Sequence, residues 1–120
     1  MHLQKIQPED IFIMGFSQGG LMALDQYLHN EKLFAGIVAL SPRVRLPANI
    51  KEFISKDKSK TSIFVGHGHE DIQIAFEETE RNINQLKKLN SNIEFHSYEM
   101  GHSICIEEIH HLRDWLNERL

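Results

Sequence analysis

The stretch Ile11-Phe12-Ile13-Met14-Gly15-Phe16-Ser17-Gln18-Gly19-Gly20 decides the fold of this chain, because it predicts a buried strand that runs through a serine into a helix. Apolar residues precede the serine, and further apolar residues recur at helical spacing from Leu21 to Leu28. Gly15–Gly19 fits the pattern G-x-S-x-G, in which a sharp strand-to-helix turn exposes the serine hydroxyl above a sheet. We therefore interpret Ser17 as a nucleophile; the alternative is an ordinary helix-capping serine in a glycine-rich turn.

The glycines around Ser17 predict a turn with little room for side chains. A Cβ atom at Gly15 or Gly19 is expected to collide with the neighbouring chain. Gly19 and Gly20 are expected to let the helix approach the strand closely.

The rest of the chain alternates between predicted strands and helices. The predicted strands are Ile11–Met14, Gly36–Leu40, Thr61–Val65 and Ile93–Tyr98; helices are predicted from Ser17 to about Asn30, at 50–54, over Ala75–Leu89 and from about Ile106 onward. This alternation predicts an α/β fold with a mostly parallel sheet of about four strands flanked by helices, and the apolar first strand suits a sheet that is covered on both faces. Length and composition favour a single domain over residues 1–120.

Composition excludes several classes of function. The net charge of −4 gives no basic stripe for a nucleic-acid backbone, and no apolar run is long enough to span a membrane. The segment Met1–Lys5 lacks the apolar core of a secretion signal, and the lone Cys105 cannot form an internal disulfide. We therefore expect a cytoplasmic protein without a nucleic-acid partner.

Ser17, Asp71 and His102 each follow the carboxyl end of a predicted strand, where ligands bind in open α/β sheets. A serine hydroxyl needs an imidazole to accept its proton, and the imidazole needs a carboxylate to fix its tautomer. The chain order Ser, Asp, His is that of α/β-hydrolases, although eight histidines make order alone a weak argument. We predict these three residues as a catalytic triad, with Glu70 as the alternative acid.

These motifs resemble those of the phospholipase/carboxylesterase group of α/β-hydrolases, which includes the acyl-protein thioesterases. Gly15–Gly20 looks like the nucleophile elbow of that group, and Leu33–Ser41 resembles the strand after its elbow helix. His67–Ile74 is similar to the group's H-G-x-x-D-x-x-V motif, which implies that Asp71 is the acid. Gly101–Ser103 is similar to its histidine loop, which implies that His102 is the base.

The resemblance implies small-molecule substrates, namely short- to medium-chain carboxylic esters or thioesters, and no cofactor or metal. It also implies that the chain is the C-terminal half of the fold, because several strands precede the elbow strand in the group. A loop among those strands supplies a second oxyanion-hole N–H, so only the N–H of Gln18 remains here. Loss of one such donor costs about 2.7–4 kcal/mol, on the order of 100- to 1000-fold in rate, so we expect a weak or inactive esterase.

The missing upstream strands would also leave Ile11–Met14 as an apolar sheet edge with unpaired backbone groups. We expect this edge to be covered by a homodimer partner, paired edge to edge or through an exchanged N-terminal element, or by a separately encoded N-terminal half. The sequence leaves these alternatives open.

Two other interpretations of the chain remain. His67-Gly68-His69-Glu70-Asp71 also fits H-x-H-x-D, the start of a zinc site, but Ile72 stands where a further histidine would be wanted. The chain could instead be a non-catalytic remnant of a split hydrolase that serves as an interaction module. Such a remnant would keep the triad residues without a complete pocket.

Overall fold

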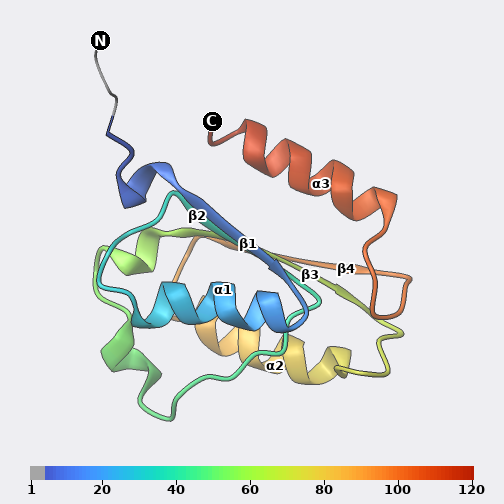
Figure 1. Cartoon of the computed structure of the whole chain (residues 1–120). Helices are drawn as coiled ribbons and strands as arrows, with labels where there is room; N and C mark the ends of the chain where they lie inside the picture. Colours follow the sequence, from blue (N-terminus) through green and yellow to red (C-terminus); the bar gives the residue numbers. More distant parts are fainter. Residues whose placement is uncertain (1–4) are drawn as a thin grey trace.

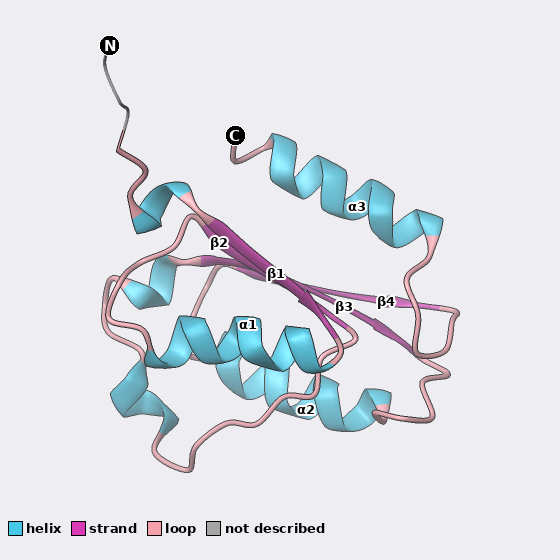
Figure 2. Cartoon of the chain, in the orientation of Figure 1, coloured by secondary structure: helices cyan, strands magenta, loops and turns pink. Residues whose placement is uncertain are grey.

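The computed structural model describes residues 5–120, so Met1–Gln4 of the polar N-terminal segment lie outside the described residues. Strands and helices alternate along the chain (Figure 1, Figure 2). In order, the elements are η1 (Pro8–Asp10), β1 (Phe12–Phe16), α1 (Gln18–His29), β2 (Gly36–Leu40), η2 (Ile50–Phe53), η3 (Lys58–Lys60), β3 (Ser62–Gly68), α2 (Phe76–Lys87), β4 (Ile93–Tyr98) and α3 (Ile106–Asn117).

The strands form one parallel sheet in the order β1-β2-β3-β4. In its register, Met14 of β1 lies opposite Val38 of β2, and Leu40 of β2 lies opposite Gly66 of β3. Parallel strands all present their carboxyl ends at the same edge of a sheet, so Ser17 and the loops after β3 and β4 meet there. The predicted α/β fold is confirmed.

Two strands run further than predicted. β1 continues to Phe16, and β3 continues to Gly68, so His67 is a strand residue and not a loop residue. Glycine is depleted in strands and histidine is not among the β-branched and large aromatic residues enriched there, which explains why the predicted strand ended at Val65.

The helices cover the two faces of the sheet unequally. Figure 1 shows α1 and α2 together on one face and α3 on the other. The larger core lies under α1 and α2 and contains Ala23, Leu24, Tyr27, Leu28, Ile37, Ala39, Val44, Ile63, Val65, Ile83 and Leu86. The smaller core lies under α3, where Trp115 packs with Val38, Leu40 and Phe64.

The carboxyl end of β1 is open on the α3 face. Trp115 contacts the ring of Phe12 with centroids 5.8 Å apart, but Met14 and Phe16 on the same face of β1 are 63% and 40% exposed. The expectation that this strand is covered on both faces is therefore wrong at its carboxyl end. β1 also lies at an edge of the sheet within the described residues, so the apolar edge expected from the sequence is present.

One carboxylate is fully buried where α3 packs on β3. Glu108 has no exposed surface, and neither of its carboxylate oxygens has a well-aligned hydrogen-bond partner. It occupies the space that a side chain at Gly66 would need, since a Cβ there would collide with the carboxylate. Burial raises the pKa of Glu108 from 4.5 to about 7, and the nearby Cys105 N–H opposes this only in part.

No helix within residues 5–120 combines the length and the apolar character needed to cross a bilayer.

Candidate active site

Ser17 occupies a strained turn between β1 and α1. Its φ of 59° and ψ of −116° lie outside the conformations that non-glycine residues normally adopt. The Ser17 N–H donates to the Leu40 carbonyl at 2.8 Å, which fixes the turn to the end of β2. The Ser17 side chain makes no capping hydrogen bond to α1, so the alternative of a helix-capping serine is not supported.

The glycines around Ser17 have different steric roles. A Cβ at Gly15 would collide with the backbone of Gly19, as expected. The expectation for Gly19 is wrong, because a Cβ there would have no atom within 4 Å. A Cβ at Gly20 would lie 2.8 Å from the Cβ of Pro42, so Gly20 permits the close approach of α1 to the segment after β2.

The structure brings Ser17, His102 and Asp71 together. The Ser17 Oγ lies 2.8 Å from Nε2 of His102, and Nδ1 of His102 lies 2.7 Å from Oδ2 of Asp71. Asp71 belongs to the loop after β3 and His102 to the loop after β4, so the triad is built across the carboxyl edge of the sheet. The Asp71 carboxylate is buried, and the His102 side chain is 10% exposed.

Asp71 is held as a carboxylate by its surroundings. Its Oδ1 accepts hydrogen bonds from the backbone N–H groups of Gln73 at 2.9 Å and Ile74 at 2.8 Å. Burial alone would raise the pKa of Asp71, but the Ile74 N–H, His102 and the Gln73 N–H outweigh it and lower the pKa below its ordinary value. An ionised Asp71 fixes the imidazole of His102 with its Nε2 directed at the serine.

His67 supports the same loop, which the sequence analysis did not foresee. This fully buried side chain contacts the Ile74 carbonyl through Nε2 at 2.8 Å and lies 3.3 Å from Oδ2 of Asp71. His67 therefore anchors the turn whose N–H groups hold Asp71. This role is indicated by the complete burial of His67 in the structure. A sequence motif does not show which of its residues are buried, so the role could not be predicted.

The other candidates near Asp71 do not converge on a common centre. Glu70 is exposed, and its backbone N–H donates to the Met100 carbonyl, whereas Asp71 is the acid that contacts His102. The ring of His69 contacts that of Phe76, with centroids 4.3 Å apart and planes tilted by 46°. Across residues 5–120, His, Cys, Asp and Glu side chains form no group of three or more that could hold a metal ion.

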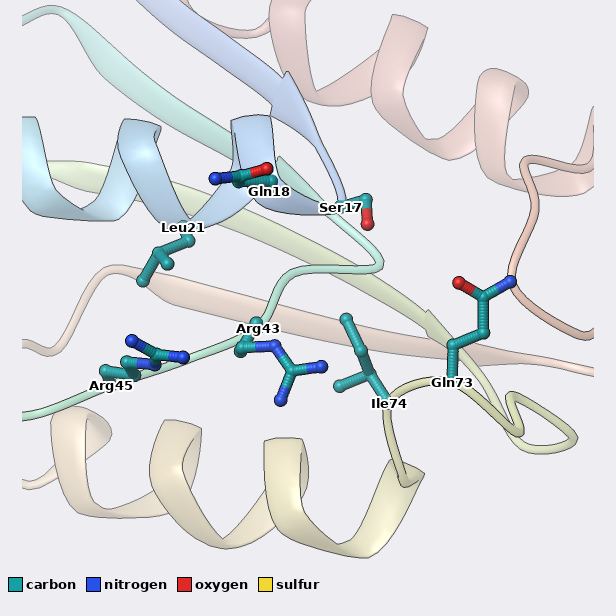
Figure 3. Close-up of a pocket in the computed structure, with 7 residues that line it drawn as sticks. All are labelled: Ser17, Gln18, Leu21, Arg43, Arg45, Gln73 and Ile74. Atoms are coloured by element: carbon teal, nitrogen blue, oxygen red, sulfur yellow. The ribbon is translucent and has the colours of Figure 1, made fainter.

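A cavity of about 280 Å³ opens beside Ser17 (Figure 3). Its lining residues are Ser17, Gln18, Leu21, Arg43, Arg45, Gln73 and Ile74. Gln18 is the first residue of α1, so its backbone N–H has no acceptor within the helix and lies beside the serine. Arg43 and Arg45 were not predicted as site residues; their signal in the sequence is an R-x-R spacing shortly after β2.

Ser41 ties the cavity wall to the histidine loop. It is fully buried with a φ of 48°, and its N–H donates to the Gly66 carbonyl at 2.7 Å. Its hydroxyl donates to the Ser103 carbonyl at 3.2 Å. Ser41, two residues before Arg43, is thus hydrogen-bonded to Ser103, the residue after His102. We call residues 42–45 the arginine segment.

A parallel sheet whose strand-to-helix serine meets an imidazole and a buried carboxylate at its carboxyl edge defines the α/β-hydrolase class. Within that class the chain belongs to the phospholipase/carboxylesterase family, which it matches over residues 2–120. The family resemblance drawn from the sequence motifs is confirmed.

Relatives carry names of two related kinds. Acyl-protein thioesterase 1 of Neurospora crassa is 37% identical over 96% of this chain and 48% of its own length. A probable carboxylesterase SOBER1-like protein of Arabidopsis thaliana is 34% identical over 96% of this chain and 44% of its own length. The chain therefore spans about half the length of these relatives.

Solved structures agree with this relationship. The crystal structure of Arabidopsis thaliana SOBER1 has a TM-score of 0.84 and 32% identity, covering 95% of this chain and 55% of that one. Zea mays acyl-protein thioesterase 2 has a TM-score of 0.82 at 24% identity, over 92% of this chain and 56% of that one, and supports the fold alone.

Proposed function

We propose that this chain is a serine hydrolase that cleaves short- to medium-chain carboxylic esters or thioesters. The observation that carries the proposal is the continuous relay from Ser17 Oγ to His102 Nε2 and from His102 Nδ1 to Asp71 Oδ2, at 2.8 and 2.7 Å. The two contacts join residues 85 and 31 positions apart in the sequence, so they arise only through the fold. The names of the family members are consistent with this chemistry.

In the proposed mechanism, Ser17 Oγ attacks the carbonyl carbon while Nε2 of His102 accepts the hydroxyl proton. The carbonyl π electrons move to oxygen, and the N–H of Gln18 stabilises the resulting oxyanion. His102 then donates its proton to the leaving alkoxide or thiolate, which departs and leaves an ester on Ser17. Water attacks that ester with His102 as base, releasing the carboxylic acid and restoring Ser17.

The activity of the chain alone is proposed to be low. The backbone N–H of Gln18 is the single proposed oxyanion donor, and loss of one donor costs about 2.7–4 kcal/mol in the transition state. Hydrolysis of p-nitrophenyl butyrate at the rate of a full-length relative would contradict this part of the proposal.

The decisive experiment is labelling with a fluorophosphonate probe, which reacts only with an activated serine. We expect the chain to be labelled at Ser17, Ser17→Ala to lose the label, and the matched control Ser91→Ala to keep it, because Ser91 is exposed and remote from His102. A folded chain that the probe does not modify would overturn the proposal.

The second candidate function is an interaction module that retains the triad residues without turnover. The open carboxyl end of β1, with Met14 and Phe16 exposed, favours a partner at this edge. The proposed partner is a second copy of the chain or a separate N-terminal half. A monomeric mass at micromolar concentration in light scattering would count against both.

Residues 1–120 are proposed to form one partial α/β-hydrolase domain, and the protein is proposed to be cytoplasmic. Limited proteolysis tests the first, and localisation of a tagged chain tests the second.

A further inference from the structure

Two arginines line the cavity beside Ser17 without an obvious structural task. Arg43 and Arg45 both border the cavity, and within residues 5–120 neither side chain makes an ion pair or a hydrogen bond. None of the residues that line the cavity is acidic. An arginine side chain stays charged at any physiological pH, so this cavity holds two uncompensated positive charges.

The backbone that carries the arginines is fixed in place. Pro42 and Val44 are buried while Arg43 and Arg45 are exposed, and this alternation places both arginine side chains on the same side of the segment. The Val44 side chain belongs to the larger core, and its carbonyl accepts a hydrogen bond from Asn82 of α2 at 3.3 Å. Gly20 of α1 packs against Pro42 from the other side.

The cavity pairs these charges with apolar walls. Figure 3 shows the two guanidinium groups around the same space as the side chains of Leu21 and Ile74, with the Ser17 hydroxyl nearby. Guanidinium groups bind carboxylates and phosphates through paired, charge-assisted hydrogen bonds. Apolar walls suit a short methylene spacer between such an anion and a reacting carbonyl.

We propose that Arg43 and Arg45 bind an anionic group, a carboxylate or a phosphate, on the ester or thioester whose carbonyl meets Ser17. This inference rests on the proposed function, which supplies the ester or thioester carbonyl. The inference adds that the substrate carries a negative charge. The anion sits on the acyl part or on the alcohol or thiol part, and the experiment below distinguishes the two sources. Arg43 and Arg45 are specificity-determining residues in this scheme and take no part in the bond-breaking steps.

The test measures binding to the Ser17→Ala chain, so that it does not depend on turnover. The ligands are monomethyl glutarate, with its anion on the acyl side; 3-acetoxypropanoate, with its anion on the alcohol side; methyl 4-phosphonobutanoate; and the neutral methyl hexanoate. NMR titration follows the side-chain Nε–H signals of Arg43 and Arg45 together with the backbone amides. We expect at least one anionic ester to shift both arginine signals and to bind roughly ten-fold more tightly than the neutral ester.

Substitution separates the arginines from the general charge of the protein. Arg43→Gln with Arg45→Gln should weaken binding of the anionic ester roughly ten-fold and so remove its preference over the neutral ester. The matched control is Arg81→Gln with Arg113→Gln, two exposed arginines outside this cavity whose loss changes the net charge equally. The control should retain the preference. The amide spectrum reports folding of each variant, and the conservative Arg43→Lys and Arg45→Lys chains provide a second comparison if a double variant misfolds.

The inference is overturned if no anionic ester binds better than methyl hexanoate, if none binds detectably, or if the control pair loses the preference equally. Fluorophosphonate labelling of the native chain reports separately on the proposed function. Labelling without anion preference removes this inference alone, and anion preference without labelling removes the proposed hydrolysis alone.

Discussion

The two flanks of Ser17 are built very differently. On the flank toward β3 and β4, Asp71 is buried, receives two backbone hydrogen bonds and positions His102 against the serine. On the flank toward β1, the outer edge of that strand has no partner within the described residues, and Met14 and Phe16 are exposed.

The contacts among Ser17, His102 and Asp71 therefore form although the outer edge of β1 is unpaired within the described residues. The relay needs only the carboxyl ends of β1, β3 and β4 in register, which the central parallel pairings supply. Under the proposed function, substrate binding and oxyanion stabilisation would need atoms on both flanks of the serine. We call the flank toward β3 and β4 the finished flank and the flank toward β1 the open flank. Substitutions on the finished flank should reduce function or stability strongly. On the open flank, the main effect should come from adding a segment that covers β1.

The largest effect is expected from Asp71→Asn on the finished flank. An amide in place of the carboxylate favours the wrong tautomer of His102 and cannot stabilise its charged form, so fluorophosphonate labelling or esterase kcat should fall about 10⁴-fold. The matched control Glu70→Gln removes an exposed neighbouring carboxylate and should change the rate by about two-fold at most. Equal losses in both variants would show that Asp71 does not act through His102.

The next effect is an expected gain on the open flank. Fusing the part of the Neurospora crassa relative that precedes its matching region to the N-terminus tests whether this part supplies the second oxyanion donor that the family resemblance implies, and whether it covers β1. We expect kcat/KM for p-nitrophenyl butyrate to rise on the order of 100- to 1000-fold over the chain alone. The same fusion with Ser17→Ala is the control. A folded fusion, verified by circular dichroism, with the rate of the chain alone would contradict the idea that the open flank limits activity.

A third effect concerns stability on the finished flank and depends on pH. Because the pKa of Glu108 is raised from 4.5 to about 7 in the folded state, the folded chain binds a proton more tightly than the unfolded chain. The stabilisation is fully present below about pH 4.5, falls as the pH rises, and is lost above about pH 7, a total of about 3 kcal/mol in the free energy of unfolding.

Replacement of Glu108 by Gln tests this assignment. Urea unfolding between pH 4.5 and 8 should show the variant gaining about 3 kcal/mol relative to the native chain as the pH rises. Glu107→Gln, which alters the exposed neighbour, is the control and should leave the native pH profile in place. A constant difference between Glu108→Gln and the native chain would mean that Glu108 does not titrate in this range.

The smallest effect compares two directly paired residues across the flanks. Val38 and Met14 face each other in the sheet register, yet Val38 is 1% exposed and Met14 is 63% exposed. Val38→Ala should cost about 2–3 kcal/mol of unfolding free energy, and Met14→Ala less than about 0.5 kcal/mol. Similar losses in urea unfolding would reveal that another copy of the chain covers Met14, which light scattering would verify.

The sequence was sufficient for the fold class and for the residues that meet at the relay. Strand and helix periods differ, so the alternating elements could be read locally, and a parallel sheet gathers its carboxyl ends at one edge. The G-x-S-x-G turn marks its serine because few other residue patterns fit such a tight turn. These features are encoded over a few neighbouring residues.

Other features depend on packing between distant segments and were missed. Glu108 looks like its exposed neighbour Glu107, and only the docking of α3 over Gly66 buries it. The steric role expected for Gly19 belongs to Gly15 and Gly20, because the direction of a missing Cβ depends on the backbone of the turn. Arg43 and Arg45 were not predicted as site residues, because the cavity that they line is formed with residues of α1 and of the loop after β3, which are distant in the sequence.

Ser41 has a consequence for how this protein can evolve. Its hydroxyl donates to the carbonyl of Ser103, the residue after His102, and its N–H donates to the carbonyl of Gly66 in β3. Under the proposed function, we expect insertions or replacements that reshape the cavity wall at the arginine segment to displace the histidine loop as well, so that selectivity and turnover would change together. Laboratory selection for new substrates should therefore retain position 41 and begin at Arg45, the arginine further along the chain from this tether.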